Sequence, residues 1–160
     1  KQMNDRRRLR SVFNKIDNDK DKYNVHLKDY LITICPQRTE KTKSIFYPFS
    51  DEQTFKKKVS IINAIVNRRF LKRNYMKRPE QKIVFYNFIE NSLNKNLIHT
   101  HSLFRIPRIL IHKLKEIFDY LISVVKNKFE FSIRIDHRPD VAIRYMTKKF
   151  SENNDRYFVC

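Results

Sequence analysis

The sequence contains no glycine at all among its 160 residues. A phosphate-binding P-loop and a dinucleotide-binding fingerprint both need glycine, because the backbone has to come close to a phosphate group. The absence of glycine therefore excludes both motifs from this chain. Any ATPase or helicase activity would have to lie on another segment.

Cysteine and long apolar runs are also scarce. Cys35 and Cys160 are far apart and form no C-x-x-C pair, so we expect neither a disulfide framework nor a structural zinc site. No apolar run approaches the roughly 18–20 residues that span a bilayer, and the opening KQMNDRRRLR lacks the apolar region of a secretory signal. We expect an intracellular protein with no membrane partner, in the bacterial cytoplasm or, for a viral protein, in the host nucleus.

Acidic residues are too few to balance the basic ones, and the formal net charge is +18. This excess of lysine and arginine predicts a polyanionic partner, either nucleic acid or an anionic membrane surface, and we favour nucleic acid. A hydrophobic content of 41% predicts a folded chain. We expect a basic N-terminal arm over residues 1–27 and a single domain over residues 28–160.

Apolar periodicity predicts the elements of this domain. In chain order we expect a strand at 29–35, a helix at 50–72, strands at 82–90 and 97–106, a helix at 108–127, a strand at 129–135 and a helix at 140–153. The first six follow the order β-α-β-β-α-β. This order is typical of the ferredoxin-like, split βαβ arrangement, an α+β fold in which helices cover one face of an antiparallel sheet. The last helix would carry Tyr145, and the residues after it are left unassigned.

A short His-Thr-His motif lies on the second strand of the predicted hairpin. Alternate residues of a strand point to the same face, so His99 and His101 should emerge together, roughly 7 Å apart at the backbone. Glu90 ends the first strand of the hairpin and can fall beside them. Two imidazoles and one carboxylate form a three-ligand site for a divalent cation, with positions left for substrate oxygens. Ordinary half-exposed strand residues are the alternative interpretation of this motif.

A tyrosine and two lysines share one face of the last predicted helix. Tyr145 and Lys148 are three residues apart, and Lys149 follows at the spacing of four. Nearby positive charge favours the phenolate form of a tyrosine, whose pKa is ordinarily about 10. A phenolate can attack phosphorus, and a lysine can stabilise the phosphate charge in the transition state. A core tyrosine followed by two solvated lysines is the alternative.

Glu90, the pair His99 and His101, and the Tyr145-Met-Thr-Lys148 motif together resemble the HUH endonuclease superfamily. Within it, the chain is similar to the single-tyrosine replication initiator (Rep) proteins of rolling-circle plasmids and circular single-stranded DNA viruses. That family has a His-hydrophobic-His strand, an acidic or polar ligand on the neighbouring strand and a later Y-x-x-K helix. Its first motif, a strand of apolar residues and threonine, is loosely similar to residues 30–34.

The resemblance implies that Glu90, His99 and His101 hold Mg²⁺ or Mn²⁺. It implies that Tyr145 attacks the scissile phosphate with support from Lys148. The activity would be sequence-specific or hairpin-specific nicking and joining of single-stranded DNA through a 5′-phosphotyrosine, which starts rolling-circle replication. A helicase domain or host replication proteins would be further partners. The cations expected to contact the DNA are Lys149, Arg144 and Arg105.

Two alternatives remain open from the sequence. A transposase or a conjugative relaxase would use the same chemistry on a different DNA substrate. A non-enzymatic module of the RNA-recognition type has the same order of elements and stacks bases on aromatic side chains of its open sheet face. The glycine-containing signature of that module is absent here, and two histidines stand on one face instead.

Overall fold

A computed structural model describes Asn14 and residues 29–36, 52–77, 81–91, 98–136 and 157–160 of the chain. Within these ranges the elements are, in chain order, β1 (Asp29–Pro36), α3 (Glu52–Leu71), α4 (Asn74–Lys77), β2 (Val84–Asn91), β3 (Ile98–Arg105), the 3₁₀ helix η2 (Arg108–Lys113), α5 (Leu114–Ser123), the π-helix η3 (Val124–Lys128), β4 (Phe131–Asp136) and β5 (Tyr157–Val159).

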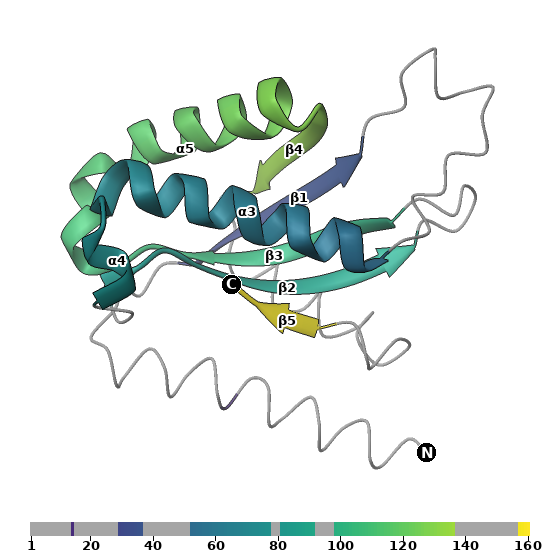
Figure 1. Cartoon of the computed structure of the whole chain (residues 1–160), viewed down its shortest axis with the longest axis horizontal. Coiled ribbons are helices and arrows are strands. Elements are labelled where there is room, and N and C mark those ends of the chain that lie inside the picture. Colours follow the sequence, from purple (N-terminus) through teal and green to yellow (C-terminus); the bar gives the residue numbers. More distant parts are fainter. Residues whose placement is uncertain (1–13, 15–28, 37–51, 78–80, 92–97, 137–156) are drawn as a thin grey trace.

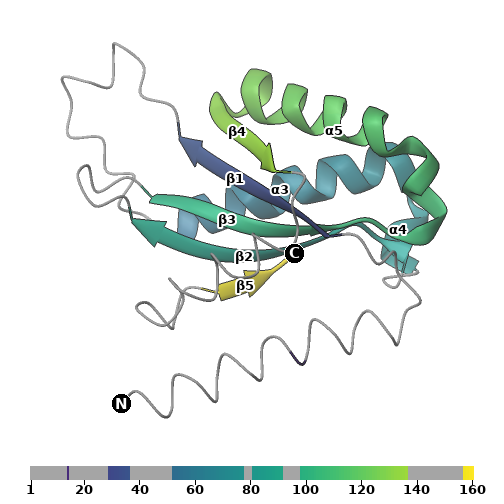
Figure 2. The same ribbon diagram turned by 180° about the vertical axis from the view of Figure 1, so that it is seen from behind.

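The five strands form one sheet in the order β4-β1-β3-β2-β5. Every neighbouring pair is antiparallel. Strands β1 and β2 lie on either side of β3, and this is the defining feature of a split βαβ unit. Helices α3 and α5 lie over the same face of the sheet (Figures 1 and 2). The predicted α+β class and ferredoxin-like arrangement are therefore confirmed.

Strict alternation of side chains along the strands creates two different sheet faces. On β1, the side chains of Tyr30, Ile32 and Ile34 are buried in the main core beneath the helices. The residues between them, including Leu31 and Thr33, point to the opposite face. That opposite face has its own small apolar cluster, built around Tyr86, Phe88 and Leu103.

The helix predicted at residues 50–72 is confirmed as α3. Its apolar stripe recurs at helical spacing and faces the sheet, where four side chains are fully buried: Phe55, Val59, Ile62 and Val66. Phe70 packs at the margin of this core. Exposed cations such as Lys57, Arg68 and Arg69 occupy other positions of the helix. The basic helix surface thus lies away from the core, as the sequence indicated.

The helix predicted at residues 108–127 divides into three segments. Pro107 is extended (φ −66°, ψ 150°), and the chain after it begins as a 3₁₀ turn because the Leu110 N–H bonds to the Pro107 carbonyl at 3.0 Å. After α5 the backbone loosens into the π-helix η3. Glu130 then takes a left-handed conformation (φ 54°), which turns the chain into β4. The apolar stripe predicted here still lies against the core, with Ile117, Leu121 and Val125 fully buried.

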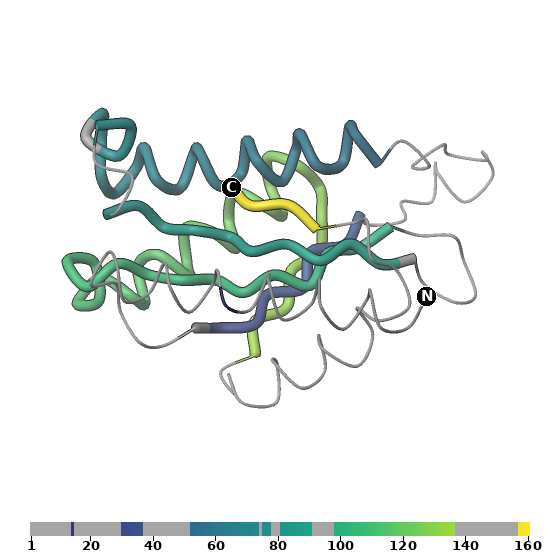
Figure 3. The backbone as a smooth tube through the Cα atoms, turned by 90° about the horizontal axis from the view of Figure 1, so that it is seen from below, coloured from purple at the N-terminus to yellow at the C-terminus, as the bar shows by residue number. Residues whose placement is uncertain are grey.

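Strand β5 comes from residues that sequence reasoning left unassigned. It pairs with β2 and forms the edge of the sheet, as Figure 3 shows in yellow. The pairing continues one residue further, since Phe85 and Cys160 exchange backbone hydrogen bonds of 2.8 and 3.1 Å. A strand of three residues is too short to show a clear alternation in the sequence.

Two predicted segments lie outside the described residues: the arm over 1–27, apart from Asn14, and the helix over 140–153. None of the helices in the described part of the chain has the length and apolar character needed to cross a membrane.

A buried amide ties α3 to the residue just before β2, and we expect its loss to weaken the fold. The Asn67 side chain is fully buried, accepts a hydrogen bond from the Ile83 N–H at 2.8 Å and donates one to the Ile83 carbonyl at 2.9 Å. Asn67→Leu would leave that N–H buried without its partner, at a cost of about 1–3 kcal/mol in the free energy of unfolding. Urea denaturation would measure this loss. The exposed control Arg68→Ala should change stability by less than about 0.5 kcal/mol.

Candidate metal centre

The register of β2 and β3 brings Glu90, His99 and His101 together on one face of the sheet. In the β2–β3 ladder, Glu90 lies directly opposite His99, and Phe88 lies opposite His101. Because alternate residues share a face, the two imidazoles and the carboxylate all emerge on the face away from α3 and α5. The fold therefore confirms the prediction that these three side chains lie close together.

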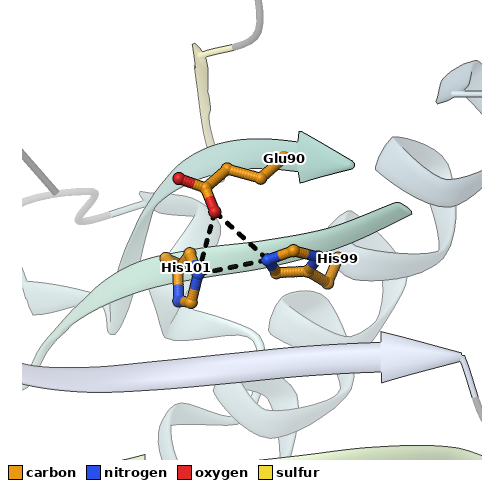
Figure 4. A group of neighbouring side chains, drawn as sticks. All are labelled: Glu90, His99 and His101. Carbon is orange, nitrogen blue, oxygen red and sulfur yellow. Dashed lines mark hydrogen bonds and ion pairs between the residues drawn. The ribbon is translucent and has the colours of Figure 1, made fainter. Parts of the chain in front are cut away.

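The three side chains direct one atom each toward a common point (Figure 4). Glu90 Oε2 lies 3.2 Å from His99 Nε2 and 3.2 Å from His101 Nε2, and the two nitrogens are also 3.2 Å apart. The imidazole planes are nearly perpendicular, at 88°. Two ligand atoms about 2.1 Å from one ion, at about 90–110° to each other, are separated by about 3.0–3.4 Å. The observed triangle has the dimensions of one face of a metal coordination shell.

The donor set itself fits a cation. A neutral imidazole has one N–H and one lone pair, and an ionised carboxylate only accepts hydrogen bonds. If both imidazoles carry their proton on Nε2, each can donate to the carboxylate, but the two N–H groups then face each other across 3.2 Å with no hydrogen bond between them. A divalent ion can attract all three ligand atoms. Glu90, His99 and His101 could therefore hold a metal ion, the only such group of acidic, histidine or cysteine side chains among the described residues.

The three side chains of the candidate centre are mostly buried, but each keeps some exposure to solvent. The side chains of Glu90, His99 and His101 are 14, 17 and 11% exposed, respectively. Three protein ligands leave further positions of a four- or six-coordinate ion for water or substrate. A centre of this type can bind a substrate oxygen while the surrounding protein restricts access of water.

The nearby thiol does not extend the ligand group. Cys35 is the next residue after Thr33 on the same face of β1. Burial raises the pKa of the Cys35 thiol above its ordinary value. Its sulfur does not belong to the group of ligand atoms within 4.8 Å of one another, which Glu90, His99 and His101 form. The candidate centre therefore consists of nitrogen and oxygen donors.

The residue between the histidines connects the site to a buried polar row on the helix side of the sheet. Thr100 is fully buried, and its hydroxyl lies 3.4 Å from the Phe88 carbonyl and 3.2 Å from the Ser102 hydroxyl. Ser102 in turn donates a hydrogen bond of 2.6 Å to the amide oxygen of Asn87. These hydrogen bonds tie β3 to β2 directly behind the site.

Arg105 does not occupy the position expected for a DNA contact. It is 1% exposed, its guanidinium lies 5.0 Å from the centre of the Tyr86 ring, and it donates a hydrogen bond of 3.2 Å to the Tyr86 hydroxyl. The ring and the hydroxyl help to compensate the cation for lost water. Since a buried guanidinium has no surface to offer a phosphate, that expectation is corrected: Arg105 is a structural residue at the end of β3.

The other predicted site residues lie outside the described part of the chain. They are Tyr145, Lys148, Lys149 and Arg144. Their expected roles as nucleophile, phosphate partner and DNA contacts stay predictions.

One residue of the site was missed by sequence reasoning. Thr33 lies opposite His101 in the β1–β3 ladder, and its hydroxyl oxygen is 3.0 Å from His101 Nδ1. The alternation of β1 already places this polar residue on the face away from the core. Only the strand order reveals that this position meets a histidine of a strand far along the chain.

Comparisons with known proteins return no relative for this chain. A scan against protein-family models finds no match, and neither a curated protein nor a solved structure matches it.

Proposed function

We propose that this protein is a divalent-metal-dependent endonuclease and strand transferase of the HUH type, acting on single-stranded DNA. The observation that carries the proposal is the triangle formed by Glu90 Oε2 and the Nε2 atoms of His99 and His101, with sides of 3.2 Å. The net charge of +18 supports a polyanionic substrate. A Y-x-x-K motif that begins at Tyr145 supplies the candidate nucleophile.

The ligand set favours Mn²⁺ over Mg²⁺ as the resident ion. Mg²⁺ is bound mainly by oxygen atoms, whereas imidazole nitrogens suit transition metals better. Mg²⁺ remains the alternative, since the carboxylate and substrate oxygens would supply oxygen ligands. When bound, such an ion would act as a Lewis acid on an oxygen of the scissile phosphate.

The proposed reaction exchanges one phosphodiester for another. The phenol oxygen of Tyr145 forms a bond to phosphorus while the bond from phosphorus to the 3′ oxygen breaks. The phenol loses its proton, and the departing 3′ oxygen gains one. Lys148 stabilises the charge on the phosphate oxygens. The resulting 5′-phosphotyrosine retains a phosphodiester linkage, so a 3′-hydroxyl can reverse the step and join strands without ATP.

A non-enzymatic sheet of the RNA-recognition type is the main alternative function. The side chains on the face of β1 and β3 that points away from the helices argue against it. Such modules stack bases on exposed aromatic side chains of their two central strands. Among the described side chains of β1 and β3, this face carries Leu31, Thr33, Cys35, His99, His101, Leu103 and Arg105. The only aromatic rings in this set are the two imidazoles, and both are directed at Glu90. The neighbouring aromatic residues of β2, Tyr86 and Phe88, are at most 4% exposed. A transposase or a relaxase would share the proposed chemistry and differ only in the DNA it recognises.

The proposal is tested by trapping the covalent intermediate. The protein is incubated with a random pool of single-stranded oligonucleotides, with Mn²⁺ or with EDTA, and analysed on a denaturing gel. We expect a protein band shifted by attached DNA only in the presence of the ion. Sequencing of the attached strands would then reveal the recognised site. A pool that contains hairpins tests the hairpin-specific form of the proposal.

Two results would contradict this function. Oligonucleotide binding that is equal in Mn²⁺ and in EDTA, without cleavage, would favour the non-enzymatic module. Cleavage without any covalent adduct would indicate a metal-dependent hydrolase that uses water rather than a tyrosine.

A further inference from the structure

Thr33 connects the metal centre to a third strand of the sheet. Its hydroxyl oxygen lies 3.0 Å from Nδ1 of His101, the ring nitrogen that faces away from Glu90 and His99. The other ring nitrogen, Nε2, lies 3.2 Å from Glu90 Oε2. The imidazole of His101 is thus held between a hydroxyl on β1 and a carboxylate on β2.

The position of Thr33 bears on which ring nitrogen of His101 carries the proton. A neutral imidazole that offers the Nε2 lone pair to a metal carries its proton on Nδ1, and a buried N–H needs an acceptor. A hydroxyl can accept this hydrogen bond, and when no ion is present it can donate to Nδ1 instead. Outer partners of this kind fix the orientation and tautomer of histidine ligands in metal proteins.

We propose that Thr33 is a positioning residue of the metal centre: its hydroxyl accepts the Nδ1–H of His101 and so holds the Nε2 lone pair toward the ion. The inference rests on the proposed metal centre at Glu90, His99 and His101. It predicts a role for β1 in metal affinity although that strand supplies no ligand. The His101 side chain is only 11% exposed, so little water is available to replace the hydroxyl as acceptor.

The test compares three substitutions at one position. Thr33→Val keeps the branched shape and the strand preference but replaces the hydroxyl with a methyl group. We expect Mn²⁺ affinity, measured by calorimetry, to fall about 10–100-fold. Thr33→Ala should lose a similar factor, whereas Thr33→Ser should restore affinity to within about threefold of the original protein. The melting temperature without metal should differ little between the serine and valine variants.

A spectroscopic readout separates this role from a general loss of structure. With Zn²⁺ as a diamagnetic probe, the Nδ1 proton of His101 should give a protected NMR signal in the original protein and in Thr33→Ser. In Thr33→Val that signal should weaken through exchange with water. Ser132→Ala is the matched control, because the Ser132 hydroxyl on the adjacent β4 bonds the Cys35 carbonyl at 3.1 Å and touches no candidate ligand.

The outcomes distinguish a failure of the Thr33 role from a failure of the proposed metal-dependent function. If the original protein binds neither Mn²⁺ nor Zn²⁺, the metal centre and the proposed function both fail. If it binds Mn²⁺ and Thr33→Val binds it equally well, only the role of Thr33 is overturned. Equal losses in Thr33→Ser and Thr33→Val would likewise contradict the hydrogen bond as the cause.

Discussion

Replacing His101 with alanine should abolish Mn²⁺-dependent cleavage of single-stranded DNA and lower Mn²⁺ affinity by more than about 100-fold. The expected size follows because even partners of metal ligands are worth about 10–100-fold in affinity. The substitution removes one corner of the triangle and leaves Glu90 and His99 as two ligands. It also removes the group that Thr33 positions.

Thermal unfolding in the presence of metal would measure this loss. A ligand at 100 times its dissociation constant stabilises the folded protein by about 2.7 kcal/mol. For a chain of this length, that stabilisation raises the melting temperature by about 5–10 °C. We expect this rise in the original protein and its absence in His101→Ala.

His112→Ala is the matched control for this experiment. His112 is an exposed histidine of η2 and does not belong to the candidate ligand group. It should keep both the metal-dependent rise and the cleavage activity. If His101→Ala still showed the full rise in melting temperature, the ion would be bound elsewhere and the proposed centre would be wrong.

Replacing Tyr145 with phenylalanine should eliminate the covalent protein–DNA adduct and reduce nicking by about 10³-fold or more. Phenylalanine keeps the aromatic ring but has no oxygen to bond to phosphorus. Loss of a nucleophile typically removes most of the catalysis that its site provides. Mn²⁺ affinity and DNA affinity should both stay within about threefold, since the substitution removes neither a candidate ligand nor a positive charge.

Tyr157 offers a stringent control for this assignment. It lies on β5 opposite Phe88, on the face of the sheet that carries the metal centre, and its hydroxyl oxygen is buried. Tyr157→Phe should keep adduct formation, because a buried hydroxyl is not accessible to DNA. Adduct formation that survived Tyr145→Phe and disappeared in Tyr157→Phe would reassign the nucleophile to β5.

Much of the fold could be predicted from the sequence, since it depends on local patterns. The spacing of Phe55, Val59, Ile62 and Val66 identifies α3, and alternation identifies the strands. The chain order of the elements then indicated the split βαβ arrangement. The division of residues 108–127 into three helical types could not be predicted, because the apolar stripe is nearly the same in all of them. Strand β5 was missed because its pairing with β2 depends on contacts far along the chain.

The sequence by itself determined that His99 and His101 share one side of a strand, because this follows from the geometry of any extended chain. It also made Glu90 a plausible neighbour through the hairpin. Only the tertiary structure decided that the three donor atoms converge at 3.2 Å, that Thr33 stands behind His101, and that Arg105 is buried against Tyr86. The physical reason is that strand order and register decide which side chains become neighbours across a sheet. These depend on packing of the whole domain rather than on the residues of any one strand.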